Sequence, residues 1–119
     1  MTATRLHLAL AALMGLCGVG LLAAGSHLAG GQASIAGEML LFHATAVIAA
    51  TTARQAGLLS NVVARTALSV LIVGVVLFAA DLALRAFVGS KLFPMAAPLG
   101  GGIIMLGWLL LALAAVKPR

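Results

Sequence analysis

The sequence predicts an all-α integral membrane protein: a four-helix transmembrane bundle formed by a single domain over residues 1–119. Of its residues, 64% are hydrophobic and only 8% are charged, and the apolar residues fall into long blocks. Soluble domains average about 25% charged residues, so this chain has too few charges to coat a water-facing surface. We therefore expect it to lie in a lipid bilayer, and we expect neither a soluble enzyme nor a nucleic-acid binder.

Four segments are long and apolar enough to be spanning helices, which need about 20 such residues. They are expected at about residues 6–24, 36–54, 66–86 and 99–116. The first is longer than the apolar core of a signal peptide, so we expect a spanning helix there. The apolar part of the second is short, which leaves open whether it crosses the whole bilayer. The third is rich in β-branched residues, but an unpaired strand is excluded in lipid.

Glycine, proline and polar residues predict the connections between these spans. We expect them over residues 25–37, 54–65 and 88–98. Ser60 or Asn61 is expected to cap the third helix, and Pro98 fits the first turn of the fourth.

The distribution of the basic residues predicts the orientation. Four spans place both termini on one side, together with the second connection. That side is expected to hold five of the seven basic residues, Arg5, Arg54, Arg65, Lys117 and Arg119, and the other side Arg85 and Lys91. By the positive-inside rule both termini are then cytoplasmic, in a bacterial inner (plasma) membrane. The net charge of +5 is accordingly interpreted as a topology signal and not as a nucleic-acid surface.

Small residues in membrane helices allow two backbones to approach closely. On this basis we expect helix packing at seven positions: Gly15, Gly20, Ala46, Ala50, Gly100, Gly101 and Gly107.

Ionisable residues at membrane depth are treated as functional by default. The expected topology places four of them near the end opposite the termini: His27, Glu38, His43 and Asp81. Histidines and carboxylates are adequate metal ligands, and two histidines can ligate haem. These four residues are therefore the candidate ligand or interaction site, although their spacing matches no diagnostic metal motif.

Three of these four residues, and His7, also have a structural interpretation. Asp81 and Arg85 are four residues apart, which predicts an ion pair on one helix face. Glu38 is expected at the start of the second helix, where a carboxylate favours the positive end of the helix dipole. His43 is expected to hydrogen-bond a neighbouring helix. His7 is expected to be an interfacial side chain at the cytoplasmic end.

Five short motifs resemble the YgdD-like family of small four-span bacterial inner-membrane proteins. They are Ala24-Gly25-Ser26-His27, Phe42-His43-Ala44, Leu77-Phe78-Ala79-Ala80, Pro98-Leu99-Gly100-Gly101 and Gly107-Trp108-Leu109-Leu110. The resemblance implies a four-span topology, a function that is not established, and His27 and His43 as recurring polar positions. The chain departs from the family in its short separation of these two histidines, in having Asp81 where a small or hydroxyl residue is expected, and in having no tyrosine.

Three functions remain open from the sequence. We expect a non-catalytic accessory or scaffold subunit of a larger inner-membrane complex, such as a respiratory or other energy-transducing one. Its expected partners are the bilayer and other membrane subunits, with lipid contacts and no resident cofactor or metal. The first alternative is a redox module in which His27 and His43 bind haem or a metal. The second is a small proton-coupled transporter, for which Asp81 is the candidate carboxylate.

Overall fold

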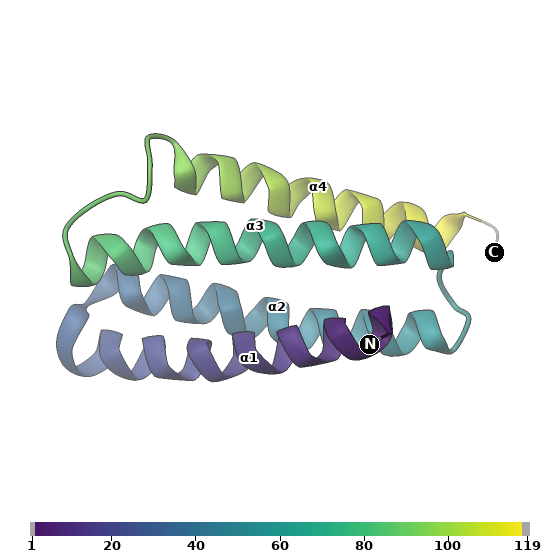
Figure 1. Cartoon of the computed structure of the whole chain (residues 1–119), viewed down its shortest axis with the longest axis horizontal. Helices are drawn as coiled ribbons and strands as arrows, with labels where there is room; N and C mark the ends of the chain where they lie inside the picture. The colour runs from purple at the N-terminus through teal and green to yellow at the C-terminus, as the bar shows by residue number, and fades with distance from the viewer. Residues whose placement is uncertain (1, 118–119) are drawn as a thin grey trace.

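Four long helices run side by side along the 46 Å long axis of the molecule, as Figure 1 shows. The structure is a computed structural model that describes residues 2–117. The helices are α1 (Ala3–Ala24), α2 (Gly31–Gln55), α3 (Asn61–Phe87) and α4 (Ala96–Val116). Each of them is long and apolar enough to cross a bilayer. The predicted four-helix transmembrane bundle is confirmed.

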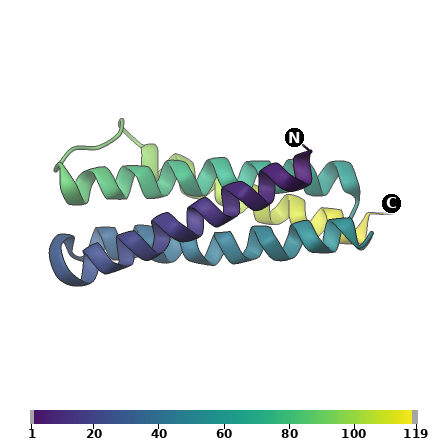
Figure 2. The same cartoon turned by 60° about the horizontal axis from the view of Figure 1, so that its bottom comes forward.

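The helices form two hairpins that meet along α2 and α3. Helix α1 packs mainly on α2, α4 packs mainly on α3, and α2 contacts α3 in the centre. In Figure 2, α1 runs obliquely, from beside α2 at one end of the bundle towards α3 at the other. In the most apolar 18-residue stretch of each helix, 44% of the residues are buried in α2 and in α3, against 17% in α1 and 22% in α4. The core therefore lies along α2 and α3, and the outer helices turn most of their apolar surface outward.

The first connection is much shorter than expected. The prediction of a loop over residues 25–37 is wrong, because the chain continues from α1 through a π-helical turn, η1 (Gly25–Ala29). Gly30 alone separates η1 from α2, with φ 77° and ψ −156°, a backbone region that only glycine adopts readily. Because α2 begins at Gly31, Glu38 lies two turns inside it, and the expectation of a carboxylate in the first turn is also wrong.

The second connection is likewise shorter than the predicted range of 54–65, since α3 already begins at Asn61 and contains Arg65. Gly57 ends α2 with φ 80°, the left-handed conformation typical of helix C-termini. Ser60 occupies the N-cap position of α3, but its side chain makes no capping hydrogen bond. Its backbone N–H instead donates to the carbonyl of Ala114 at 2.9 Å, which ties this connection to the end of α4.

The third connection covers residues 88–95, and α4 then begins at Ala96, earlier than expected. Pro98 consequently lies in the first turn of α4, as predicted, where its missing N–H is tolerated. Met95 precedes the helix with a positive φ of 67°.

Both hairpins contain a glycine-to-glycine crossing. Between α1 and α2, a Cβ atom placed on Gly37 would lie 2.8 Å from the carbonyl oxygen of Gly18. Between α3 and α4, a Cβ atom on Gly100 would lie 3.0 Å from the carbonyl oxygen of Gly74. Any side chain at these positions would push the backbones apart. The close approach of each helix pair therefore depends on these glycines.

The seven predicted packing positions divide into two groups. Five lie at helix contacts or line a groove between helices: Gly15, Ala46, Ala50, Gly100 and Gly107. At Gly20 and Gly101 the prediction is wrong, because a Cβ atom there would meet no described atom of another helix within 4 Å. The crossing residues Gly18, Gly37 and Gly74 were not predicted.

We expect Gly37→Ala to destabilise the bundle, with Gly20→Ala as the matched control. Alanine is the better helix former by about 1 kcal/mol, and this gain applies at both positions. The free energy of unfolding of Gly37→Ala should therefore lie about 1–3 kcal/mol below that of the control, which is the usual cost of overpacking. Denaturant titration in a mild detergent measures both variants. Equal stability would show that the crossing does not hold the hairpin.

Candidate functional site

The four residues of the candidate site occupy separate environments. His27 is exposed in η1 and Glu38 is exposed on α2, whereas His43 and Asp81 are buried. Within residues 2–117, no hydrogen bond or ion pair joins any two of the four. The described residues contain no group of three His, Cys, Asp or Glu side chains that could hold a metal ion. The structure thus does not assemble the predicted cluster into one site.

Asp81 connects the end of α3 to the third connection. Its carboxylate is fully buried, and its Oδ2 atom accepts a hydrogen bond from Nε of Arg85 at 2.9 Å, in the ion pair that the spacing predicts. Its Oδ1 atom accepts from the backbone N–H of Leu92 at 2.8 Å. Both carboxylate oxygens are therefore bound, one by the Arg85 side chain and one by the backbone of Leu92. Through the bond to Leu92 the carboxylate anchors the segment over residues 88–95.

His43 joins α2 to α4. The indole Nε1 of Trp108 lies 3.1 Å from Nε2 of His43, and an indole nitrogen can only donate. Nε2 is therefore the acceptor, and the ring proton lies on Nδ1, which donates to the carbonyl of Met39 at 2.8 Å. The two rings meet edge to face, with centroids 5.7 Å apart. Both ring nitrogens are bound, so His43 fits a haem or metal only if the bond to Trp108 is broken.

A second polar network joins three helices at the end where α1 begins. Arg54 of α2 is 7% exposed and donates to Thr4 Oγ1 of α1 at 2.7 Å and to Asn61 Oδ1 of α3 at 2.8 Å. Nearby, Nε2 of His7 lies 3.1 Å from the Ser69 hydroxyl, which joins α1 to α3. His7 is only 4% exposed, so its expected placement as an interfacial side chain is wrong.

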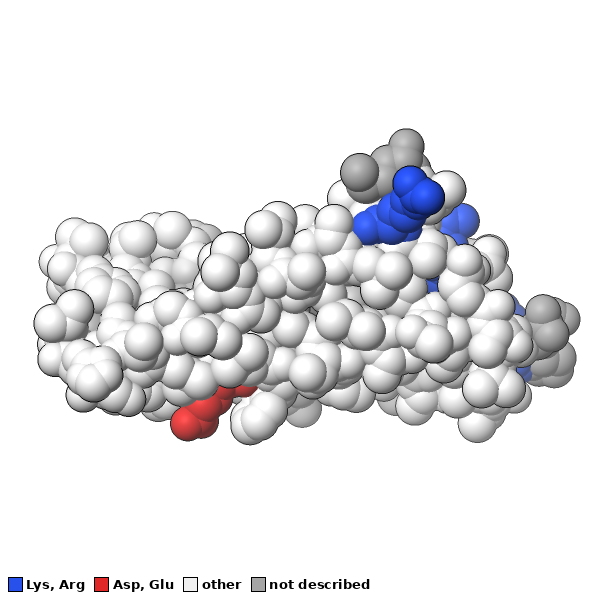
Figure 3. All heavy atoms as spheres, turned by 90° about the horizontal axis from the view of Figure 1, so that it is seen from below, with Lys and Arg blue, Asp and Glu red and all other residues white. Residues whose placement is uncertain are grey.

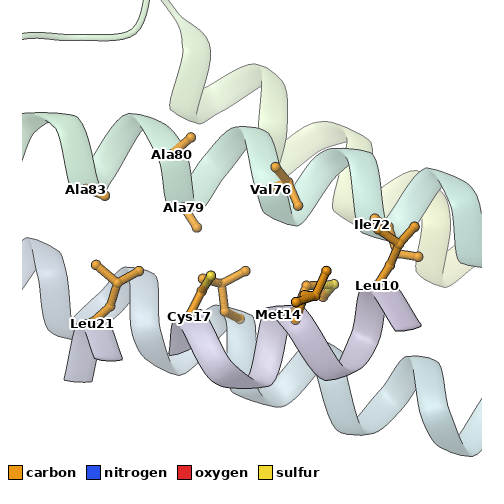
Figure 4. Close-up of a pocket in the computed structure, with 11 residues that line it drawn as sticks. Leu10, Met14, Cys17, Leu21, Ile72, Val76, Ala79, Ala80 and Ala83 are labelled. Carbon is orange, nitrogen blue, oxygen red and sulfur yellow. The ribbon is translucent and has the colours of Figure 1, made fainter. Parts of the chain in front are cut away.

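Two hollows lie between α1 and α3. The first, which we call the basic hollow, has a volume of about 540 Å³ and its polar lining residues are His7, Arg65, Thr66 and Ser69. The second, which we call the apolar groove, has a volume of about 270 Å³ and is shown in Figure 4. It begins one turn further along α1, and its lining includes Leu10, Met14, Cys17, Ile72, Val76 and Ala79.

A third hollow separates α2 from α4 on the other side of the bundle. It has a volume of about 560 Å³ and we call it the alanine groove, after the residues Ala46, Ala49, Ala50, Ala53, Ala112 and Ala115 that line it beside Trp108. The groove shows that α2 and α4 do not pack closely there, and that the hydrogen bond between His43 and Trp108 crosses from one wall helix to the other.

Most of the described basic side chains lie towards one end of the bundle, and both acidic side chains lie towards the other, together with Arg85 and Lys91. In Figure 3, Lys and Arg gather near one end of the visible face, and the acidic atoms that are visible lie towards the other. The basic end holds four of the five residues that were expected to face the cytoplasm, namely Arg5, Arg54, Arg65 and Lys117. The fifth, Arg119, lies outside the described residues. The chain contains only two acidic residues, and both lie in the half of their helices away from this end.

Comparison with known proteins places the chain in a family. The sequence profile described as "Protein of unknown function (DUF423)" matches residues 21–101, more than half of the chain. The chain belongs to this family. The DUF423 match runs from the last turn of α1 to the first turns of α4, so it includes His27, His43 and Asp81 but not His7 or Trp108. The motif Gly107-Trp108-Leu109-Leu110, part of the resemblance to the YgdD-like family, lies outside it.

A curated relative supports the membrane location of this DUF423 member. The chain is 32% identical over 82 residues to a "UPF0382 membrane protein" of Haemophilus influenzae. The alignment covers 69% of this chain and 64% of that protein, so the chain spans less than two thirds of its relative's length. No solved structure matches the chain significantly. Together with the four apolar helices, the relative shows a multi-pass membrane protein whose helices contact lipid.

Apart from Arg85 beside Asp81, the sequence does not indicate the partners of the buried polar residues. In the sequence, Arg54 indicates topology alone, and Trp108 stands out only as part of a motif. One available signal was that Arg54 lies next to the predicted connection and close to Asn61, so that both ends of a tight turn carry polar side chains. No local signal pairs His43 with Trp108, because 65 residues separate them.

We expect the bond between His43 and Trp108 to contribute measurably to stability. In a double-mutant cycle of Trp108→Phe and His43→Leu, the coupling free energy should be about 1 kcal/mol, within the range known for hydrogen bonds between membrane helices. The cycle is measured by denaturant titration in detergent micelles. A coupling free energy near zero would mean that the two side chains are neighbours without a stabilising bond.

We also expect Asp81 to protect the third connection from hydrogen exchange. Asp81→Ala removes the acceptor of the Leu92 N–H, so this amide should exchange much faster. Asp81→Asn keeps an oxygen for that bond, and Arg85→Gln leaves the carboxylate in place, so both should retain most of the protection. Hydrogen exchange read by mass spectrometry on a peptide that contains Leu92 tests this. Unchanged exchange in Asp81→Ala would refute the anchor.

Proposed function

We propose that this DUF423 member is a non-catalytic accessory or scaffold protein of a larger membrane complex. The buried polar side chains carry the proposal, because each one that forms a hydrogen bond uses it to hold the fold together. Arg54 joins three helices, His43 joins α2 to α4, and Asp81 fixes the third connection. Groups committed to such structural bonds are poorly placed for proton transfer or ligand exchange.

The outer surfaces support a role in assembly. Large apolar side chains are exposed along α1 and α4, among them Leu13, Leu16, Met105 and Leu109. Exposed apolar surface contacts lipid by default in a membrane protein. The alanine groove differs, because its small side chains would let another helix approach closely, which is how membrane helices associate.

The charge distribution supports an orientation. The four described basic residues at the end where α1 begins outnumber Arg85 and Lys91 at the other end. By the positive-inside rule this arrangement favours cytoplasmic termini in a bacterial inner membrane. The shared motifs support placing the chain with the YgdD-like proteins inside its family.

The assembly role can be tested by filling the alanine groove. Ala112 of α4 is exposed and lines it, whereas Ala12 of α1 is exposed and lines none of the three hollows. We expect the wild-type chain and Ala12→Phe to co-migrate with partner subunits after extraction in mild detergent, and Ala112→Phe to lose them. Cross-linking before extraction and native electrophoresis give the readout.

Three outcomes would count against this function. If the wild-type chain always migrates alone at its monomer size, it is not part of a larger complex. Equal loss of partners in Ala12→Phe and Ala112→Phe removes the groove as the contact. A Soret band or a stoichiometric metal in the purified wild-type chain would favour the redox alternative with His27 and His43.

A further inference from the structure

The basic hollow concentrates positive charge at the start of α1 and α3. These two helices run in the same direction, and the hollow is lined by Ala3 and Val62 from their first turns. Helix N-termini carry positive dipole ends and unpaired N–H groups that favour anions. The Arg65 side chain lies in the lining itself, with the hydroxyls of Thr66 and Ser69 beside it. The hollow therefore offers one full positive charge and two helix ends to a ligand, while the Thr66 hydroxyl donates to the carbonyl of Val62 and the Ser69 hydroxyl is bonded to His7.

Among residues 2–117, which the structure describes, no carboxylate side chain pairs with the residues around the hollow. His7, Arg54 and Arg65 lie within electrostatic range of one another. The two carboxylate side chains of the chain, at Glu38 and Asp81, lie towards the other end. His7, which lines the hollow and is 4% exposed, has no described hydrogen-bond partner for its Nδ1 atom, and Nε of buried Arg54 also has none. An anion bound in the hollow would pair with Arg65 and could accept a hydrogen bond from Nδ1 of His7.

The apolar groove continues between the same two helices, beginning one turn beyond His7 at Leu10. Its polar surface is negligible, and its lining is aliphatic apart from sulfur atoms of Met14 and Cys17 (Figure 4). A hollow that contains the charge of Arg65 and a buried histidine, followed by an aliphatic groove, matches the two parts of a phospholipid. We propose that the basic hollow binds the phosphate of an anionic phospholipid, whose acyl chains lie along the apolar groove.

The dimensions of the helices agree with this placement. Helix α3 has 27 residues and is therefore about 40 Å long, longer than the hydrocarbon core of about 30 Å. Its first turns thus reach the headgroup layer, where Arg65 meets a lipid phosphate. One leaflet of about 15 Å corresponds to about ten residues of helix. An acyl chain that starts at Arg65 therefore passes Ile72 and ends near Val76, both of which line the apolar groove.

The headgroup contact is tested by removing one charge at a time. The delipidated full-length chain in a neutral detergent is titrated with phosphatidylglycerol or with phosphatidylcholine of the same acyl chains, and bound lipid is counted by native mass spectrometry. Arg65→Gln removes the charge in the hollow. Lys117→Gln removes a charge that is also exposed and lies at the same end of the bundle, outside the hollow.

We expect the wild-type chain to bind phosphatidylglycerol at least about tenfold more tightly than phosphatidylcholine, as one charged hydrogen-bonding contact allows. Arg65→Gln should lose that preference and Lys117→Gln should keep it. Arg65 is exposed, so the variant should fold normally, which circular dichroism checks. The site is refuted if the wild type does not distinguish the two lipids, or if both variants lose the preference equally.

The acyl-chain contact is tested by filling the groove. Val76 and Val73 are both exposed on α3, but only Val76 lines the apolar groove. Val76→Phe should weaken phosphatidylglycerol binding several-fold, and Val73→Phe should not. Inorganic phosphate, titrated as a competitor, should displace the lipid only at a far higher concentration. If phosphate competes as well as the lipid, or if the two valine variants behave alike, the ligand is a free anion and the lipid assignment is wrong.

Discussion

Close contact between glycine backbones is the constraint on which the rest of this bundle depends. In lipid no hydrophobic force draws one apolar helix to another, so association relies on van der Waals packing at small residues. Gly18 against Gly37 and Gly74 against Gly100 bring the helices of each hairpin to backbone contact. With the hairpins fixed in this way, α2 and α3 supply the core, and the polar side chains come within bonding distance.

Hydrogen bonds between polar side chains join the two hairpins to each other, which the glycine contacts do not do. Each glycine crossing lies within one hairpin. Hydrogen bonds such as that of Trp108 with His43 and that of Arg54 with Asn61 join the hairpins. Arg54 also bonds Thr4 within the first hairpin. Burying such polar groups in an apolar medium costs free energy unless they are paired. Because the first two of these pairs form between hairpins, an arrangement of the hairpins that separates the partners would leave them unpaired and would be disfavoured. The two hairpins thus dock in a defined register although their shared surface is mostly aliphatic.

The sequence predicts the number and kind of helices well, because a span is a local property of about 20 residues. The ends were less predictable: Gly25 to Gly37 reads as a loop by composition, yet all of it except Gly30 is helical. Nor could the sequence place His43 beside Trp108 or bury His7, because both depend on how distant helices turn towards each other. The spacing of Asp81 and Arg85 was informative, since a helix alone brings these two side chains together.

The third connection bears on the position of the bundle along the membrane normal. Its residues Leu92, Phe93 and Met95 are exposed apolar side chains, and the carboxylate of Asp81 holds the segment against the end of α3. A restrained apolar segment at a helix end partitions into the boundary between headgroups and acyl chains. This segment would hold its end of the bundle at a fixed depth along the membrane normal. The protein would then adapt to bilayers of different thickness by tilting its helices.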